Sequence, residues 1–143
     1  MSFENAEADR RIGNIVRIGK VHSVDPATSS AIMDFGDFKS PPLQIGQLTG
    51  GAIQFWCMPS VGEQMMVMCP SGDIAQGVIY GSVYASNTPS ADGSVPMINL
   101  AGGQMIINGT LIVTVDVIAN GVSLVHHTHP GISSGPSSTG EPN

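Results

Sequence analysis

Short runs of apolar residues, separated by turn-forming residues, extend from residue 13 to about residue 84. These runs predict five strands, at residues 15–24, 30–35, 53–58, 64–69 and 77–84. The turns between them contain Asp25-Pro26, Pro41-Pro42, Gly50-Gly51, Pro59 and Ser71-Gly72-Asp73. Five short strands in about seventy residues are typical of a small closed or partly closed barrel. A five-stranded OB-like barrel is the simplest candidate, although the spacing alone does not separate it from an SH3-like barrel.

A different pattern follows the polar link at residues 85–93. Between residues 104 and 118 the odd positions are apolar except for Gly109, namely Met105, Ile107, Leu111, Val113, Val115 and Val117. The even positions mix polar and apolar residues, so one face of the predicted strands is continuously apolar and the other is half apolar. Asn108-Gly109 and Asn120-Gly121 predict tight turns, and β-branched residues favour a strand over residues 110–120.

Three short strands with one apolar face cannot bury that face by themselves. Either this sheet covers the barrel and completes a single sandwich-like domain, or identical sheets from neighbouring chains close around a common axis. The pattern leaves both interpretations open. Frequent Gly and Pro leave room for a helix only near the N-terminus, at residues 4–11, so the chain is predicted to be essentially all β.

Composition narrows the class of protein. The mean hydropathy of +0.16 is too high for a disordered chain, and no apolar run approaches the ~18 residues of a membrane-spanning helix. Residues 1–11 are polar and acidic and lack the apolar stretch of a signal peptide. The sequence therefore predicts a soluble globular protein that stays on the cytoplasmic side of the cell that makes it.

Charge and cysteine content exclude further classes. Eleven acidic residues against five basic ones give a net charge of −6, and Lys39 is the one basic residue beyond position 20. No basic surface can form over most of the chain, so binding to nucleic acid is not expected. Cys57 and Cys69 each lie in an apolar run and are predicted to be buried thiols rather than a disulfide.

Three of the four histidines fall together in His126-His127-Thr128-His129. In an extended strand His127 and His129 would point to one side and His126 to the other. Such a pair can chelate one metal ion, and imidazole suits iron, zinc, nickel and copper. Two ligands are too few for a tight site, so distant residues or other copies of the chain would have to complete it. If three chains met on an axis, three pairs would supply an octahedral set of nitrogens; otherwise the histidines are solvated or structural.

No catalytic motif accompanies the histidines. A cupin-like metalloenzyme would place a carboxylate soon after the histidine pair, but Pro130-Gly131 and a Ser-rich segment follow instead. Ser123 lacks the G-x-S-x-G context of a nucleophile elbow, so no enzyme is predicted. The Pro/Gly/Ser tail at residues 130–143 is interpreted either as a frayed terminus or as a segment that covers the histidines.

Two parts of the chain resemble a known family. Two segments resemble the N-terminal OB domain of phage baseplate assembly protein V. They are RIGNIVRIGKVHSVDPATSSAIMDFGD (residues 11–37) and SVGEQMMVMCPSGDIAQGVIYGSVY (residues 60–84). A third segment, DVIANGVSLVHHTHPGISSGPSSTGEP (residues 116–142), resembles the spike-tip sequence of the same family. This family forms the central tail spike of contractile-tailed phages and is related to the spikes of type VI secretion systems.

The resemblance implies an all-β homotrimer. It assigns residues 1–12 to an N-terminal arm, 13–86 to an OB-fold barrel, 87–129 to a linker and a short triangular β-helix of three intertwined chains, and 130–143 to a tail that covers the tip. His127 and His129 of each chain would bind one iron ion per trimer through six imidazoles. Calcium or chloride, present in some relatives, has no motif here that can be transferred.

The implied function is structural. The protein would be a virion component, made in the bacterial cytoplasm, that lies at the tip of the tail baseplate and contacts other baseplate and tail tube proteins. It would pierce the host outer membrane, without residing in it, when the sheath contracts. The alternative is an OB-fold module that binds oligosaccharide or single-stranded nucleic acid. Its stacking rings would come from Phe35, Phe38, Phe55, Trp56, Tyr80 and Tyr84, but basic residues are scarce.

Overall fold

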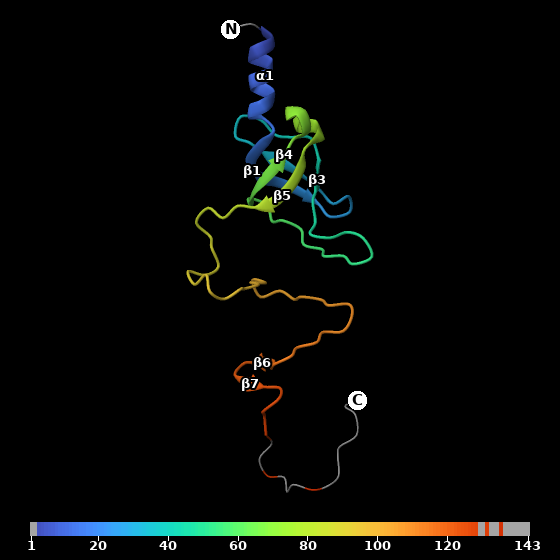
Figure 1. Cartoon of the computed structure of the whole chain (residues 1–143), viewed down its shortest axis with the longest axis vertical. Coiled ribbons are helices and arrows are strands. Elements are labelled where there is room, and N and C mark those ends of the chain that lie inside the picture. The colour runs from blue at the N-terminus through green and yellow to red at the C-terminus, as the bar shows by residue number, and fades with distance from the viewer. Residues whose placement is uncertain (1–2, 129–130, 132–134, 136–143) are drawn as a thin grey trace. The chain divides into compact units, whose positions relative to one another are not determined.

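A computed structural model describes residues 3–128, 131 and 135 of the chain. The chain divides into two units, Met1–Met97 and Ile98–Asn143. The first unit begins with helix α1 (Phe3–Gly13) (Figure 1). Its other elements are β1 (Val16–Asp25), β2 (Ser30–Asp34), β3 (Leu43–Ile45), β4 (Gln64–Met68), the 3-10 turns η1 (Pro70–Gly72) and η2 (Ile74–Gln76), and β5 (Val78–Ser82). The second unit contains β6 (Ile118–Ala119) and β7 (Val122–Ser123).

The five strands of the first unit form a closed barrel in the order β1-β2-β3-β5-β4. The long strand β1 pairs antiparallel with both β2 and β4, which its ten residues allow because each partner uses a different part of it. Closure depends on a short parallel pairing of β3 with β5, in which Gln44 faces Val78 and Ile45 faces Ile79. The predicted five-stranded OB-like barrel is therefore confirmed, and the barrel closes without help from the C-terminal segment.

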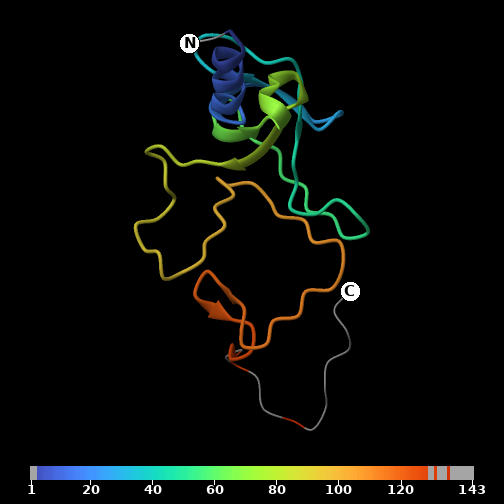
Figure 2. The same ribbon diagram turned by 45° about the horizontal axis from the view of Figure 1, so that its top comes forward.

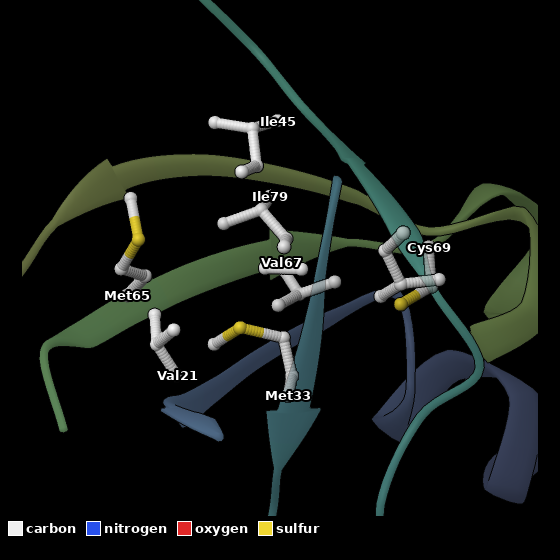
Figure 3. Packing of buried hydrophobic residues seen from close by; sticks show 9 residues of the cluster. Val21, Met33, Ile45, Met65, Val67, Cys69 and Ile79 are labelled. Atoms are coloured by element: carbon white, nitrogen blue, oxygen red, sulfur yellow. The ribbon is translucent and has the colours of Figure 1, made fainter. Parts of the chain in front are cut away.

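The barrel interior is filled by side chains from every strand (Figure 3). In β4, Met65 and Val67 point inward while Met68 is exposed, as strict alternation requires. Complete burial of such a side chain stabilises the fold by about 1.5–3 kcal/mol. The buried apolar set is Val21, Ala31, Met33, Leu43, Ile45, Met65, Val67, Cys69 and Ile79.

One predicted strand is wrong. Residues 53–58 lie in the loop between β3 and β4, where the strand-like pairing is a single bridge between Gly50 and Gln54. The third strand is instead Leu43–Ile45, directly after the two prolines that were interpreted as a turn. Leu43 and Ile45 fill the core, whereas Ile53 is 78% exposed. A proline is tolerated before the first residue of a strand, so the turn and the strand adjoin.

The two cysteines differ, contrary to prediction. Cys69 is buried in the barrel core, and burial raises the pKa of its thiol. Cys57 is exposed because it belongs to the same loop as Ile53 rather than to a strand. Both are free thiols, as expected.

The helix predicted near residues 4–11 is present and slightly longer, and none of its side chains is buried. Glu7 pairs with Arg10 and Arg11 at 2.9 Å, so one carboxylate holds two successive turns of α1 together. Both views show the end of α1 beside η1 (Figures 1 and 2). There the backbone of Gly72 comes so close that a Cβ at this position would lie 2.2 Å from the carbonyl oxygen of Arg11. A glycine is therefore required where α1 contacts the barrel.

The described part of the second unit has little regular structure of its own. Residues 98–117, coloured orange in Figure 2, contain no strand. The strands predicted over residues 104–118 are thus absent from the single chain, except that Ile118 enters the short pair β6–β7. A sandwich in which this segment covers the barrel would need an extended sheet, which one chain does not form here. No helix in the described part of the chain is long and apolar enough to cross a lipid bilayer.

Candidate functional site: the apex hairpin

Among the described residues of the C-terminal unit there is one compact element, a hairpin near their end. Ile118 pairs with Ser123 and Ala119 with Val122. Between them Asn120 and Gly121 have φ angles of 49° and 80°, as in the type I′ turn that suits the twist of a two-residue hairpin. The predicted Asn-Gly turn is therefore confirmed. We call residues 116–128 the apex hairpin.

Asp116 binds the two ends of this hairpin together. Its Oδ1 accepts hydrogen bonds from the backbone N–H of Val117 at 2.8 Å and of Val125 at 3.2 Å. The hydroxyl of Ser123 also hydrogen-bonds to the carboxylate, and this bond is the main reason that the pKa of Asp116 lies below its ordinary value. Within the described apex, residues 116–128, Asp116 and Ser123 are half-buried and the other residues are exposed.

Ser123 continues the network toward the histidines. Its Oγ accepts the backbone N–H of His126 at 2.8 Å, and its carbonyl oxygen accepts the backbone N–H of His127 at 3.2 Å. Leu124 to His126 therefore form a turn rather than an extended strand. The strand-like alternation predicted for the histidines is wrong at His126, because the serine draws the main chain into this turn.

The imidazole of His127 is held by the same turn. Its Nδ1 lies 3.0 Å from the carbonyl oxygens of both Ser123 and Leu124. A carbonyl oxygen can only accept, so Nδ1 carries the proton and the lone pair of the neutral ring is on Nε2. In metal sites the other ring nitrogen of a ligating histidine commonly donates to a carbonyl in this way. The tautomer thus assigns any metal ligation by His127 to Nε2.

The second predicted ligand, His129, lies outside the described residues. Among residues 3–128, 131 and 135, no three His, Cys, Asp or Glu side chains gather in a group that could hold a metal ion. The described part of one chain therefore does not make a complete site. Sequence reasoning missed Asp116 and Ser123; the available signal was an acid inside an apolar run, placed before an Asn-Gly turn with a serine after it.

The aromatic residues of the barrel were the other candidate binding surface. Phe35 and Phe38 pack with their ring centroids 5.2 Å apart, and the guanidinium of Arg17 lies over them at 5.0 and 5.2 Å. Arg17 also pairs with Asp37 at 3.8 Å. These two rings are thus covered by the chain's own arginine rather than presented for stacking.

The described residues thus comprise a closed OB barrel, an apolar segment that forms no strand and a hairpin that carries His126 and His127. Residues 18–84 match the type VI secretion system/phage-baseplate injector OB domain, and residues 121–143 match the GpV apex motif. Together the two matches span more than half of the chain. The chain belongs to the gpV family of phage baseplate spike, or injector, proteins. No curated protein sequence matches it significantly.

Membership of this family confirms several predictions. The protein is a structural, non-enzymatic component of the phage baseplate at the tip of the tail. As a baseplate component it has other baseplate proteins as partners. The OB domain match ends at residue 84, where the polar link begins, and the apex match begins at Gly121, within the turn of the hairpin.

Proposed function

We propose that three copies of this chain form the central spike of the baseplate. Residues 87–129 of the three chains wind into a short triangular β-helix, and its tip pierces the host outer membrane when the tail sheath contracts. The observation that carries the proposal is the exposure of an alternating apolar sequence that pairs with no strand among the described residues.

That exposure is extensive. Apolar side chains of the C-terminal unit range from 40% exposed at Val117 to 87% at Ile106. Soluble monomers rarely leave such a continuous apolar surface in water, and an extended segment with unpaired N–H and C=O groups recruits further strands. Pairing with identical segments would give these backbone groups hydrogen-bond partners and would also bury the odd-numbered face. The exposed set is Ile98, Leu100, Met105, Ile106, Ile107, Leu111, Ile112, Val113, Val115, Val117, Ile118, Val122, Leu124 and Val125.

The histidines support three copies rather than two. His127 and His129 of three chains would together present six imidazole nitrogens, a number that matches octahedral iron. When bound, the iron would link the three chain ends, so that its binding energy adds to the stability of the assembled tip. The chain's own contribution is the turn after β7, which holds His127 with Nδ1 on two carbonyl oxygens.

Mechanical work at the tip requires that the chain ends do not fray. The apex hairpin is closed by the Asn120-Gly121 turn and by Asp116, which bonds to residues on both sides of it. Only Asp116 and the histidines can carry charge between residues 98 and 128. Few charges would therefore have to be desolvated as the spike enters a bilayer.

Two measurements on the untagged full chain test the proposal. Native mass spectrometry should give a trimer, and elemental analysis should give one iron per three chains. His127→Ala should leave the trimer intact and remove the metal, whereas His22→Ala, which changes the histidine of the barrel, should leave both unchanged. A monomeric chain would overturn the spike assembly. Full iron content in His127→Ala would overturn the metal site.

A further inference from the structure

We propose that Asp116 and Ser123 are positioning residues that orient the imidazole of His127 within each chain before the chains assemble. This inference rests on the proposed iron site but assigns a role to two residues that do not themselves bind the metal. It follows from a series of hydrogen bonds within the apex hairpin, from those that the Asp116 carboxylate accepts to those between Nδ1 of His127 and two carbonyl oxygens.

The direction of each bond in the series is fixed by chemistry. An ionised carboxylate can only accept, so the Ser123 hydroxyl donates its proton to Asp116. The lone pairs of Ser123 Oγ are then turned toward the backbone N–H of His126, which donates to it at 2.8 Å. Asp116 simultaneously holds the N–H of Val125 at 3.2 Å. The turn that presents the accepting carbonyl groups is therefore fixed on both sides.

The imidazole is the last member of the series. The carbonyl oxygens of Ser123 and Leu124 converge on Nδ1 at 3.0 Å each. This arrangement selects the Nδ1–H tautomer and the plane of the ring. Without Asp116 the N–H of Val125 loses its acceptor, and without the Ser123 hydroxyl the N–H of His126 loses its acceptor. Water then competes for these groups, because the apex is otherwise exposed.

Orienting the ring in the single chain lowers the cost of assembly. A side chain that is already ordered loses less entropy when it binds, so affinity rises without a new contact to the ligand. Partners that orient a metal ligand from outside the coordination sphere are typically worth 10–100-fold in metal affinity. We therefore expect Asp116→Ala and Ser123→Ala each to weaken iron binding by about 10–100-fold.

The experiment compares the full-length trimer with four variants by chelator competition for iron. Ser123→Thr keeps the hydroxyl and should bind like the native protein, whereas Ser123→Ala should not. Asp92→Ala is the matched control for charge. Asp92 also accepts hydrogen bonds from a nearby serine, Ser94, which likewise lower its pKa, but it lies outside the apex hairpin. It should have native affinity.

A second readout does not depend on the metal. Histidine-selective ¹⁵N NMR of the iron-free protein reports the tautomer of His127, with its signal assigned by its loss in His127→Ala. The native chain and Ser123→Thr should show the Nδ1–H form, and Asp116→Ala and Ser123→Ala a mixture of both tautomers. A role in stability alone would not move this equilibrium selectively.

The outcomes separate this inference from the proposed function. If His127→Ala retains iron, the metal site itself fails. If His127→Ala loses iron but Asp116→Ala and Ser123→Ala keep native affinity and the native tautomer, only the positioning role fails. If Asp116→Ala does not form a trimer, the comparison of Ser123→Ala with Ser123→Thr tests the positioning role instead. If Ser123→Ala does not form a trimer either, the residues act in folding and the inference is overturned.

Discussion

Val115 and Ile112 provide a direct test of which face of the C-terminal segment is buried in the proposed trimer. In the single chain the two side chains are almost equally exposed, at 84% and 81%. Both are β-branched, and neither lies in a strand. Val115 occupies the continuously apolar odd face and Ile112 the mixed even face. An aspartate at either position should therefore affect one isolated chain equally, and any difference must arise in the assembly.

The expected difference is large because each substitution is repeated in three chains. Burying a valine side chain stabilises by about 1.5–3 kcal/mol, so losing three amounts to about 5–9 kcal/mol. That loss alone lowers the association constant at least about a thousandfold. Three buried carboxylates facing one another add a further penalty. Val115→Asp should therefore abolish the trimer at micromolar concentration, whereas Ile112→Asp should retain it.

Sedimentation velocity on the two full-length variants and the native protein provides the assay. Far-UV circular dichroism checks that the OB barrel is intact in both, as it should be, since the barrel closes within one chain. Equal loss of the trimer in both variants would refute the assignment of the odd face to the interior. A stable trimer in Val115→Asp would refute burial of that face altogether.

Three further results are expected from the barrel and α1. Gly72→Ala should lower the urea midpoint more than Gly62→Ala. Both positions have positive φ, which costs about 1–2 kcal/mol for alanine, but only at Gly72 would the Cβ meet the backbone of α1. Leu43→Ala should destabilise the barrel by about 2–5 kcal/mol and Ile53→Ala by less than about 0.5 kcal/mol, measured by urea unfolding. Hydrogen bonds from two arginines lower the pKa of Glu7 from 4.5 to about 2. Its contribution to helix stability should therefore be complete above pH 4.5 and be lost as the pH falls through about 2, a change in ellipticity that Glu7→Gln should lack.

The barrel could be predicted largely from the sequence because the pattern that identifies most of its strands lies within each strand. Alternating side chains in β1 and β4 identify strands wherever one face is buried and the other is not. The same reasoning predicts a strand at residues 53–58, a longer apolar run than Leu43–Ile45, because the apolar pattern does not show which segment closes the barrel. A strand of three residues completes the barrel because its backbone pairs on both sides, with Ser30 and Ala31 of β2 and with β5. No periodicity within three residues could show that.

The candidate site was predicted only in part, for a different reason. The histidines indicate metal binding by their residue type alone. Asp116, in contrast, accepts a hydrogen bond from Val125 across the hairpin, a contact that depends on the Asn120-Gly121 turn. A single acid among apolar residues reads as a solvent-facing position of a strand. Its role becomes visible only when the turn brings residue 125 back beside it. The strands predicted over residues 104–118 are missing, apart from Ile118 in β6, because no neighbouring strand among the described residues pairs with them.

The two parts of the C-terminal unit therefore differ in what they need in order to fold. Every hydrogen bond of the apex hairpin described above joins residues at most nine positions apart, so the apex can form in one chain at little loop-closure cost. Residues 98–115 contain no strand, and in the proposed trimer they would pair with other copies. In the proposed trimer this order has a consequence for register. Because a slip of one residue would exchange the apolar and mixed faces of every strand, three preformed apex hairpins that meet at one point fix the alignment of the segments that lead to them.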